Sequence, residues 1–180
     1  VDVFDREAVF IDRRLIPWTK RFPKLKIVLE HLSSKIAVDF VRSAEPQVGG
    51  TITPYHLVLN RTDWLGYGLR PYMYCMPVIK TEMDRRALVE AATSGDSRFF
   101  LGTDSAPHPV TKKLNVIGAA GLFNSPVAIE TYAKVFAQVG KLDKLEAFTS
   151  LNGPRHYGLK PNAEKITLET VSYTHLRAHE

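Results

Sequence analysis

A single cysteine, Cys75, stands in a chain of 180 residues. A disulfide framework is therefore excluded, and because such a chain is typical of a reducing compartment, we expect a cytoplasmic protein. Long apolar runs are also absent. None approaches the ~18 residues that cross a bilayer, so we expect no membrane partner. Glycine and proline number 11 each, too few and too scattered for a collagen or a low-complexity linker.

The beginning of the chain lacks two further features. No basic segment followed by an apolar stretch opens it, so we expect no signal peptide. The first residue is Val1 rather than methionine, and we expect the natural start to be missing.

The remaining composition is that of an ordinary globular protein. Hydrophobic residues make up 44% of the chain and charged residues 24%, with a mean hydropathy of −0.13, which excludes wholesale disorder. A net charge of +5 and a pI near 9.3 raise the question of a nucleic-acid ligand. However, the basic residues between 13 and 26 are interleaved with apolar residues at helical spacing. They indicate the solvated face of an amphipathic helix, and we expect no nucleic-acid partner.

Strands and helices alternate along the sequence. The β-rich runs lie at residues 25–31, 50–54 and 98–104. Helices are expected over residues 5–22 with a kink or restart at Pro17, from Ser33 or Ser34 onward, over 81–95, over 124–140 and over 144–150, with a last turn at 152–158. The aromatic-rich stretch 55–77 has no clean period and is expected to be a functional loop. This alternation predicts parallel βαβ units, with the three strands adjacent in chain order, as part of a larger α/β fold.

Two of the expected strands end on side chains that bind metals or move protons, His31 and Asp104. In parallel α/β folds, sites collect at the carboxyl ends of the strands, so these two residues lie where a site would be. Each also has a plainer interpretation: a hydrogen-bonded core histidine for His31, and a helix cap or Asx turn for Asp104. No HExxH, CxxC or GxGxxG motif occurs to support a zincin, a zinc finger or a dinucleotide fold.

Longer motifs favour the functional interpretation. The stretch Phe99-Phe-Leu-Gly-Thr-Asp-Ser-Ala-Pro-His108 resembles the strand-eight signature of dihydroorotases, members of the amidohydrolase superfamily, and residues 118–124 continue the match. Further matching segments follow the family's order and spacing: residues 2–7, 30–31, 51–57, 70–71, 74–77, 150–154 and 157–159. The resemblance covers about residues 1–169 and is closest to the compact bacterial homodimeric type.

The resemblance implies a fold, a reaction and a partner. The family fold is a (β/α)8 barrel with two zinc ions at its carboxyl face, and this chain corresponds to its C-terminal part, strands six to eight with their helices. The implied reaction is the zinc-dependent, reversible hydrolysis of the cyclic amide of dihydroorotate to N-carbamoyl-aspartate in pyrimidine biosynthesis. A homodimer is implied for the intact enzyme.

The resemblance also assigns roles at matching positions. His31 matches a zinc-ligand histidine, and Asp104 matches the aspartate that binds the other zinc and carries the proton. His108 and the backbone of Ala120 match groups that hold the substrate carboxylate, and the backbone of Met76 matches a contact to the ring. Three more residues are expected only near the site: Asn60, Arg61 and Tyr74. A structural, hydrogen-bonding role is expected for His56.

The departures from the family pattern limit what this chain does alone. The His-x-His pair of strand one, the bridging carboxylated lysine, a second histidine ligand and the arginine and asparagine that grip the substrate carboxylate have no counterpart in the sequence. We therefore expect the chain to be inactive by itself. Two alternatives stay open: a related cyclic amidase of the hydantoinase or allantoinase kind, against which His108 and the glycine-rich loop argue, and a non-catalytic barrel fragment that only binds a partner chain.

The family similarity stops after Glu169. The last residues, 171–180, resemble a translated sequencing-adapter tail, so residues 170–180 are expected to be non-native and disordered. On this interpretation His175 and His179 are not a metal site, although they lie four residues apart.

Overall fold

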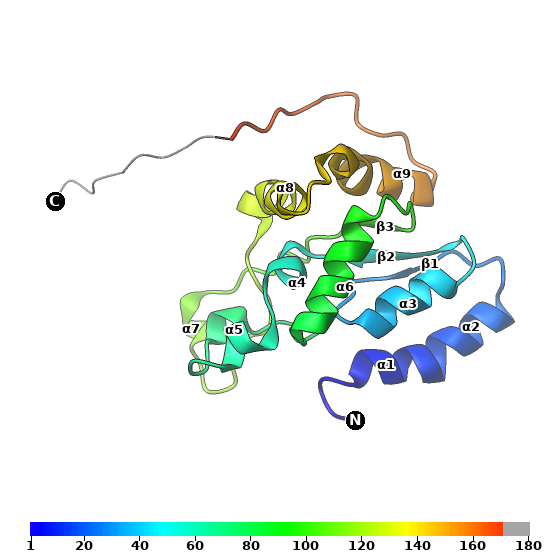
Figure 1. The fold of residues 1–180 in the computed structure, drawn as a ribbon. Coiled ribbons are helices and arrows are strands. Elements are labelled where there is room, and N and C mark those ends of the chain that lie inside the picture. Colours follow the sequence, from blue (N-terminus) through cyan, green and yellow to red (C-terminus); the bar gives the residue numbers. More distant parts are fainter. Residues whose placement is uncertain (171–180) are drawn as a thin grey trace.

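A three-stranded parallel sheet lies at the centre of the protein (Figure 1). The structure, a computed structural model, describes residues 1–170, and the expected tail of residues 171–180 with its two histidines lies outside the described residues. The strands are β1 (Ile27–Leu29), β2 (Val48–Ile52) and β3 (Phe99–Leu101), and they are ordered β1-β2-β3. The predicted order and parallel pairing are confirmed, although β1 and β3 are shorter than expected and β2 begins two residues earlier than expected.

Helices fill most of the intervals between and after the strands. Their bounds are α1 (Arg6–Phe10), η1 (Ile11–Leu15), α2 (Ile16–Arg21), α3 (Lys35–Ser43), α4 (Pro54–Val58), α5 (Arg61–Leu65), η2 (Pro71–Met73), α6 (Glu82–Thr93), α7 (Val110–Lys113), η3 (Ser125–Val127), α8 (Ala128–Gln138), η4 (Leu142–Lys144), η5 (Ala147–Leu151) and α9 (Asn152–Tyr157). The α3 and α6 helices pack against each other beside the sheet, and the α1–α2 helix lies outside α3 (Figure 1).

The first helix restarts near Pro17, as predicted. The segment η1 is a π-helical turn, and α2 begins one residue before the proline. Proline has no N–H to donate to the carbonyl four residues earlier, so a wider turn at this point accommodates the lost bond. Ile11 and Leu15 are buried, whereas Arg13 and Arg14 are exposed, as expected for an amphipathic helix.

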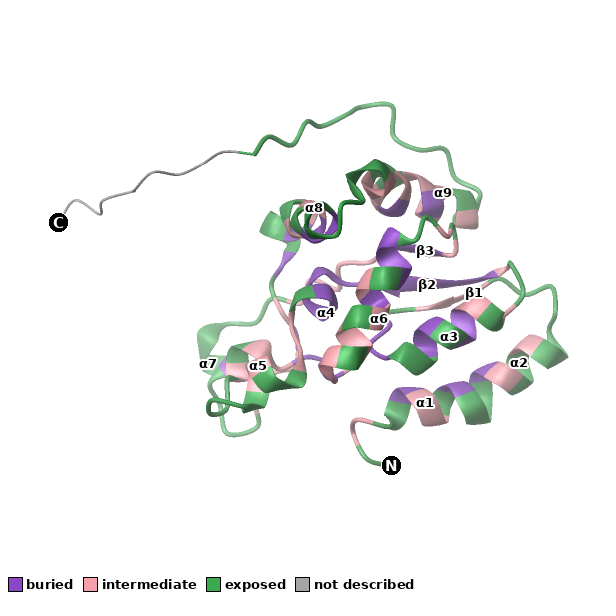
Figure 2. Ribbon diagram, in the orientation of Figure 1, coloured by how far each residue is buried: buried purple, intermediate pink, exposed green. Residues whose placement is uncertain are grey.

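The core is built around β2, which is buried along its whole length (Figure 2). Its two glycines allow neighbouring side chains to approach the backbone. A Cβ at Gly50 would lie 2.6 Å from the Leu32 side chain, and one at Gly49 would lie 3.0 Å from Phe100. Any larger side chain here would therefore push these residues off the middle strand.

Two expected helix starts are confirmed by their caps. The Ser34 hydroxyl accepts a hydrogen bond from the Ala37 N–H at the start of α3, and Thr81 forms a reciprocal capping box with Asp84 at the start of α6. Each cap satisfies N–H groups that the helix itself leaves unpaired.

Two expectations for the irregular segments were wrong in part. The stretch 55–77 is not a continuous loop, because α4, α5 and η2 occupy much of it; their shortness hides the 3.6-residue period. The helix expected from Asn124 begins as the 3₁₀ turn η3, and Asn124 makes no side-chain cap. Its amide instead donates a hydrogen bond to the Thr103 carbonyl, 2.9 Å away, so the side chain serves the preceding loop.

Among residues 1–170, no helix combines the length and the apolar composition that crossing a membrane requires.

Candidate functional site at the strand ends

His31 and Asp104 meet at the carboxyl end of the sheet. They follow β1 and β3, which lie on either side of β2, and the Nε2 atom of His31 is 4.0 Å from Oδ1 of Asp104. Both side chains are partly exposed, at 30% and 26%. The predicted convergence of these two residues at one end of the sheet is therefore confirmed as geometry.

The backbone at both residues is unusual. Among the described residues, His31 (φ 56°) and Asp104 (φ 43°) are the two non-glycine residues in the left-handed region. Holding such a residue there costs about 1–3 kcal/mol, and strain of this kind concentrates at functional sites. The left-handed backbone changes the direction of the chain just after each strand, where the two side chains approach each other.

Thr51 on β2 fixes the turn at His31. Its hydroxyl oxygen accepts a hydrogen bond from the His31 N–H (2.8 Å) and donates one to Oε2 of Glu30 (2.6 Å). Gly102, directly after β3, leaves room for the Thr51 side chain because it has no side chain of its own. A Cβ at Gly102 would lie 2.6 Å from the Cβ of Thr51. The middle strand thus orients a candidate ligand of the outer strand.

Tyr55 reaches the other candidate ligand from the first turn of α4. Its hydroxyl donates a hydrogen bond to Oδ2 of Asp104 over 2.7 Å. Burial, together with this bond, raises the pKa of Tyr55 above its ordinary value, so the hydroxyl keeps its proton and acts as a donor.

His56, the next residue, is buried and has a structural role, as expected. One ring nitrogen pairs with the Thr53 hydroxyl (2.9 Å) and the other with the Pro77 carbonyl (3.1 Å). Burial lowers the pKa of His56 to about 3, and the positive charge of Lys80 adds to the effect. The ring is neutral at pH 7 and ties the start of α4 to the segment before α6.

The long loop after β3, residues 103–124, is folded back beside Asp104. Ser105 pairs with Leu122 in an isolated parallel bridge, and the Ser105 hydroxyl accepts hydrogen bonds from the N–H groups of Asn124 and Ser125. The two ends of the loop are thereby joined one residue after Asp104.

Within this loop, His108 and Ala120, the two residues expected to hold the substrate carboxylate, contact each other. The Nε2 atom of His108 lies 2.9 Å from the Ala120 carbonyl oxygen, and the imidazole is exposed. A protonated imidazole and main-chain N–H groups are the kinds of donor that bind a carboxylate.

Lys113 holds the same loop from inside. Its buried ammonium donates to three carbonyl oxygens, those of Tyr74 (3.0 Å), Ala119 (2.9 Å) and Gly121 (2.8 Å). Burial lowers the pKa of Lys113, but the three acceptors use all of its donors. The two residues that flank Ala120 are therefore fixed by one side chain.

The other residues expected at or near the site make the following contacts. Tyr74 contributes its carbonyl to Lys113 and to the Gly121 N–H. Met76, two residues further on, is exposed. Asn60 caps α5, and the Arg61 guanidinium lies 6.0 Å from the Phe4 ring.

Within residues 1–170, no three histidine, cysteine or acidic side chains gather as a metal cluster. His31 and Asp104 are a pair, and the neighbouring Glu30 carboxylate is engaged by Thr51. The donor types nevertheless suit a divalent metal, since a neutral imidazole nitrogen and a carboxylate oxygen are ordinary zinc ligands.

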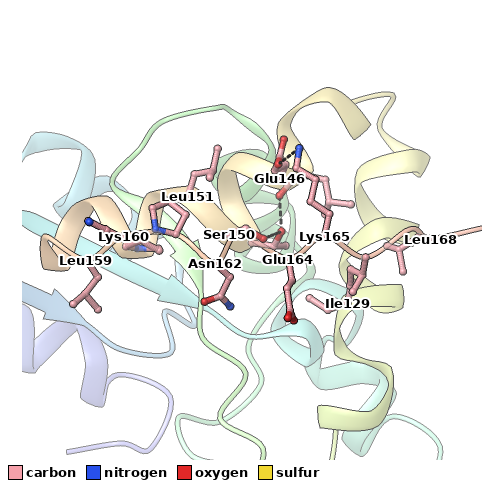
Figure 3. A pocket seen from close by; sticks show the side chains of 15 residues that line it. Ile129, Glu146, Ser150, Leu151, Leu159, Lys160, Asn162, Glu164, Lys165 and Leu168 are labelled. Carbon is pink, nitrogen blue, oxygen red and sulfur yellow. Dashed lines mark hydrogen bonds and ion pairs between the residues drawn. The ribbon is translucent and has the colours of Figure 1, made fainter.

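A separate pocket lies elsewhere in the structure. About 590 Å³ in volume, it is enclosed by α8, η5, α9 and the segment 159–168, and Figure 3 shows Lys165 near Glu146 across it (3.8 Å). None of the candidate site residues lines this pocket. It is formed where the C-terminal segment crosses the helices and carries no cluster of reactive side chains.

Sequence reasoning missed three residues that organise the site, Thr51, Tyr55 and Lys113. Thr51 and Tyr55 lie within a matched motif, but β2 supplies no candidate ligand, so nothing local indicated their partners. Lys113 resembles any other lysine of a basic loop in sequence. Only its burial reveals its role.

Comparisons with known proteins agree with the resemblance seen in the motifs. No protein-family model matches the chain. A dihydroorotase of Coxiella burnetii is 56% identical over 168 residues, which cover 93% of this chain and 48% of the relative. A dihydroorotase crystal structure from Saccharomyces cerevisiae, in complex with 5-fluoroorotic acid, superposes with a TM-score of 0.82 at 37% identity, over 89% of this chain and 45% of that one.

A more distant likeness concerns the fold alone. An L-hydantoinase of Arthrobacter aurescens superposes with a TM-score of 0.70 at 20% identity, over 81% of this chain and 34% of that one. The hydantoinase alternative is therefore less well supported than the dihydroorotase one. The described α/β arrangement matches about half of the barrel of the dihydroorotase structure, and a C-terminal piece is consistent with these matches. The chain spans about half the length of the curated relatives it matches, and it belongs to the dihydroorotase family.

Proposed function

We propose that this chain, as part of a complete enzyme, carries out the reversible hydrolysis of dihydroorotate to N-carbamoyl-aspartate. The observation that supports it most is the meeting of His31 and Asp104, both with left-handed backbone, at the carboxyl end of the sheet. The relative from yeast was crystallised with 5-fluoroorotic acid, a pyrimidine carboxylic acid of the same class as this substrate. The family places the reaction in pyrimidine biosynthesis.

Zinc is the proposed cofactor, with two ions in the complete enzyme. His31 Nε2 and Asp104 Oδ1 are the donors that this chain offers, and further ligands would come from the part of the enzyme that the chain does not include. A bound zinc ion acidifies water and polarises a carbonyl oxygen, which are the two requirements of amide hydrolysis.

The chain's own residues then take distinct tasks. Asp104 accepts a proton from the water whose oxygen bonds to the ring carbonyl carbon, and delivers it to the ring nitrogen as the C–N bond breaks. A placed acid–base group of this kind is worth ~10²–10⁴ in rate. His108 and the main chain at Ala120 hold the substrate carboxylate, which orients the ring for attack. The main chain at Met76 contacts the ring.

The decisive experiment needs the missing part of the enzyme. We define the fusion protein as the part of the C. burnetii dihydroorotase that precedes the matched region, joined to Val1 of this chain. It should bind zinc, interconvert dihydroorotate and N-carbamoyl-aspartate, and run as a homodimer on gel filtration. The isolated chain should be inactive.

Asp104→Asn tests the role of the carboxylate in the fusion protein. The amide removes the negative charge and the proton acceptor, so we expect kcat to fall by ~10²–10⁴ in both directions. Asp39→Asn is the matched control, because Asp39 is exposed on α3 and pairs only with Lys35. Retention of most of the kcat by Asp104→Asn would contradict the proposal, and turnover of hydantoin in preference to dihydroorotate would support the cyclic-amidase alternative.

A further inference from the structure

We propose that Tyr55 is a positioning residue for Asp104: its hydroxyl holds one carboxylate oxygen and so turns the other toward His31. The inference rests on the proposed function in one respect, because it takes Asp104 to be the metal ligand and proton carrier. No expectation from the sequence assigned a role to Tyr55.

The two oxygens of Asp104 have different surroundings. Oδ2 accepts a hydrogen bond from the Tyr55 hydroxyl over 2.7 Å, whereas Oδ1 faces Nε2 of His31 at 4.0 Å. A hydrogen bond to a charged acceptor is among the strong ones in proteins. The bond therefore fixes the rotation of the carboxylate and leaves Oδ1 as the oxygen available on the His31 side.

Tyr55 itself is held rigidly. Its side chain is 3% exposed and packs with Cys75 and Ile79 in a small apolar cluster separate from the main core. Its ring also lies against the His56 ring, with centroids 4.7 Å apart. Because α4 begins directly after β2, with Thr53 as its cap, the hydroxyl is placed by the sheet rather than by a mobile loop.

The consequence is that β2 and the first turn of α4, which carry no candidate ligand, orient both candidate ligands. Thr51 fixes the turn at His31, and Tyr55 fixes the carboxylate that follows β3. Groups that orient a metal ligand typically change metal affinity or activity by about 10–100-fold when they are removed. An effect of this size is expected from the Tyr55 hydroxyl alone.

Tyr55→Phe in the fusion protein removes the hydroxyl and keeps the ring. We expect zinc affinity, measured by competition with a chelator, to fall about 10–100-fold, and kcat to fall with the zinc site saturated. The KM for dihydroorotate should stay close to that of the parent, because Tyr55 lies on the Asp104 side and not at His108. Incorporation of p-aminophenylalanine at position 55 restores a donor at the same place and should recover much of the zinc affinity.

Tyr132→Phe is the matched control. The Tyr132 hydroxyl is also buried and donates over 2.7 Å, but to the Ile52 carbonyl rather than to Asp104. We expect it to lower the melting temperature at least as much as Tyr55→Phe does, without changing zinc affinity or kcat. A merely structural Tyr55 would behave like Tyr132.

The outcomes separate this inference from the proposed function. Parental zinc affinity and kcat in Tyr55→Phe, beside a damaged Asp104→Asn, would overturn the positioning role alone. Normal zinc binding and turnover in Asp104→Asn would overturn the proposed function. If Tyr55→Phe proves too unstable to purify, the p-aminophenylalanine variant decides: a melting temperature near the parent with weak zinc binding would overturn the inference, and parental zinc binding would support it.

Discussion

The two sides of the candidate site are stabilised by different means. The strand-end region, residues 29–33 and 51–57, is the continuation of a buried parallel sheet, and its polar groups lie within four residues of the ends of β1 and β2. The loop region, residues 105–124, has little regular structure and is held by side chains that bind main-chain carbonyls and N–H groups. The proposed function assigns the reacting groups to the strand ends and the binding of the substrate carboxylate to the loop region.

Two buried lysines allow this comparison to be tested directly. Lys113 holds the loop region, whereas Lys80 contacts the Ser33 hydroxyl (2.5 Å) in the strand-end region. Lys113→Met in the fusion protein leaves the Ala119 and Gly121 carbonyls without the lysine donor, whereas the Tyr74 carbonyl keeps the Gly121 N–H. Because unsatisfied buried groups cost about 1–3 kcal/mol each, we expect a loss of at least ~2 kcal/mol in the free energy of unfolding, measured by urea denaturation.

The same pair of variants should differ in substrate binding. Lys113→Met should raise the KM for dihydroorotate because the backbone around Ala120 loses its anchor, whereas Lys80→Met should destabilise the protein and leave KM near the parental value. Equal effects of the two variants on KM would remove the distinction between the regions.

His108→Ala probes the grip on the substrate. Loss of a hydrogen bond to a charged group costs about 1.5–3 kcal/mol, so we expect KM to rise by roughly 10–100-fold in steady-state assays. The kcat should fall only as far as misorientation of the ring allows. A variant with a collapsed kcat and an unchanged KM would show that His108 belongs to the chemistry rather than to the binding.

Thr51→Val tests the strand-end region with a side chain of nearly the same shape. It removes the acceptor of the His31 N–H, so we expect a loss of about 1–2 kcal/mol in the free energy of unfolding, with weaker zinc binding. The KM for dihydroorotate should change little. Thr149→Val is the control, because the Thr149 hydroxyl bonds only within its own helical segment, to the Leu145 carbonyl and to its neighbour Ser150.

The smallest expected effect is a pH dependence from His56. In the unfolded chain this histidine takes up a proton below about pH 6.5, whereas the folded pKa is about 3. Its contribution to stability is therefore complete above pH 6.5 and is lost as the pH falls toward 3. Between pH 8 and 5.5 we expect His56 to account for roughly 1 kcal/mol of lost stability. Urea unfolding of His56→Gln at the two pH values should lack this component; an identical pH slope in both proteins would contradict it.

Much of the fold was accessible from the sequence because its signals are local. Strand-forming runs alternate with helical segments that begin at recognisable capping residues, such as Ser34 and Thr81. That alternation alone indicates parallel pairing. The short helices α4 and α5 escaped prediction because five residues are too few to display a period. Asn124 was misassigned because its cap-like position says nothing about a competing carbonyl at Thr103.

The sequence by itself determined the family, the order of the strands and the two residues that end β1 and β3, since each depends on residue types at fixed spacing. The tertiary structure decided how these residues are held. It placed His31 and Asp104 in left-handed turns. It joined His31 to Thr51 and Asp104 to Tyr55, which lie 20 and 49 positions apart in the chain. It also buried the Lys113 ammonium among three carbonyl oxygens. Such contacts depend on distances in space, which chain packing sets and local sequence does not encode.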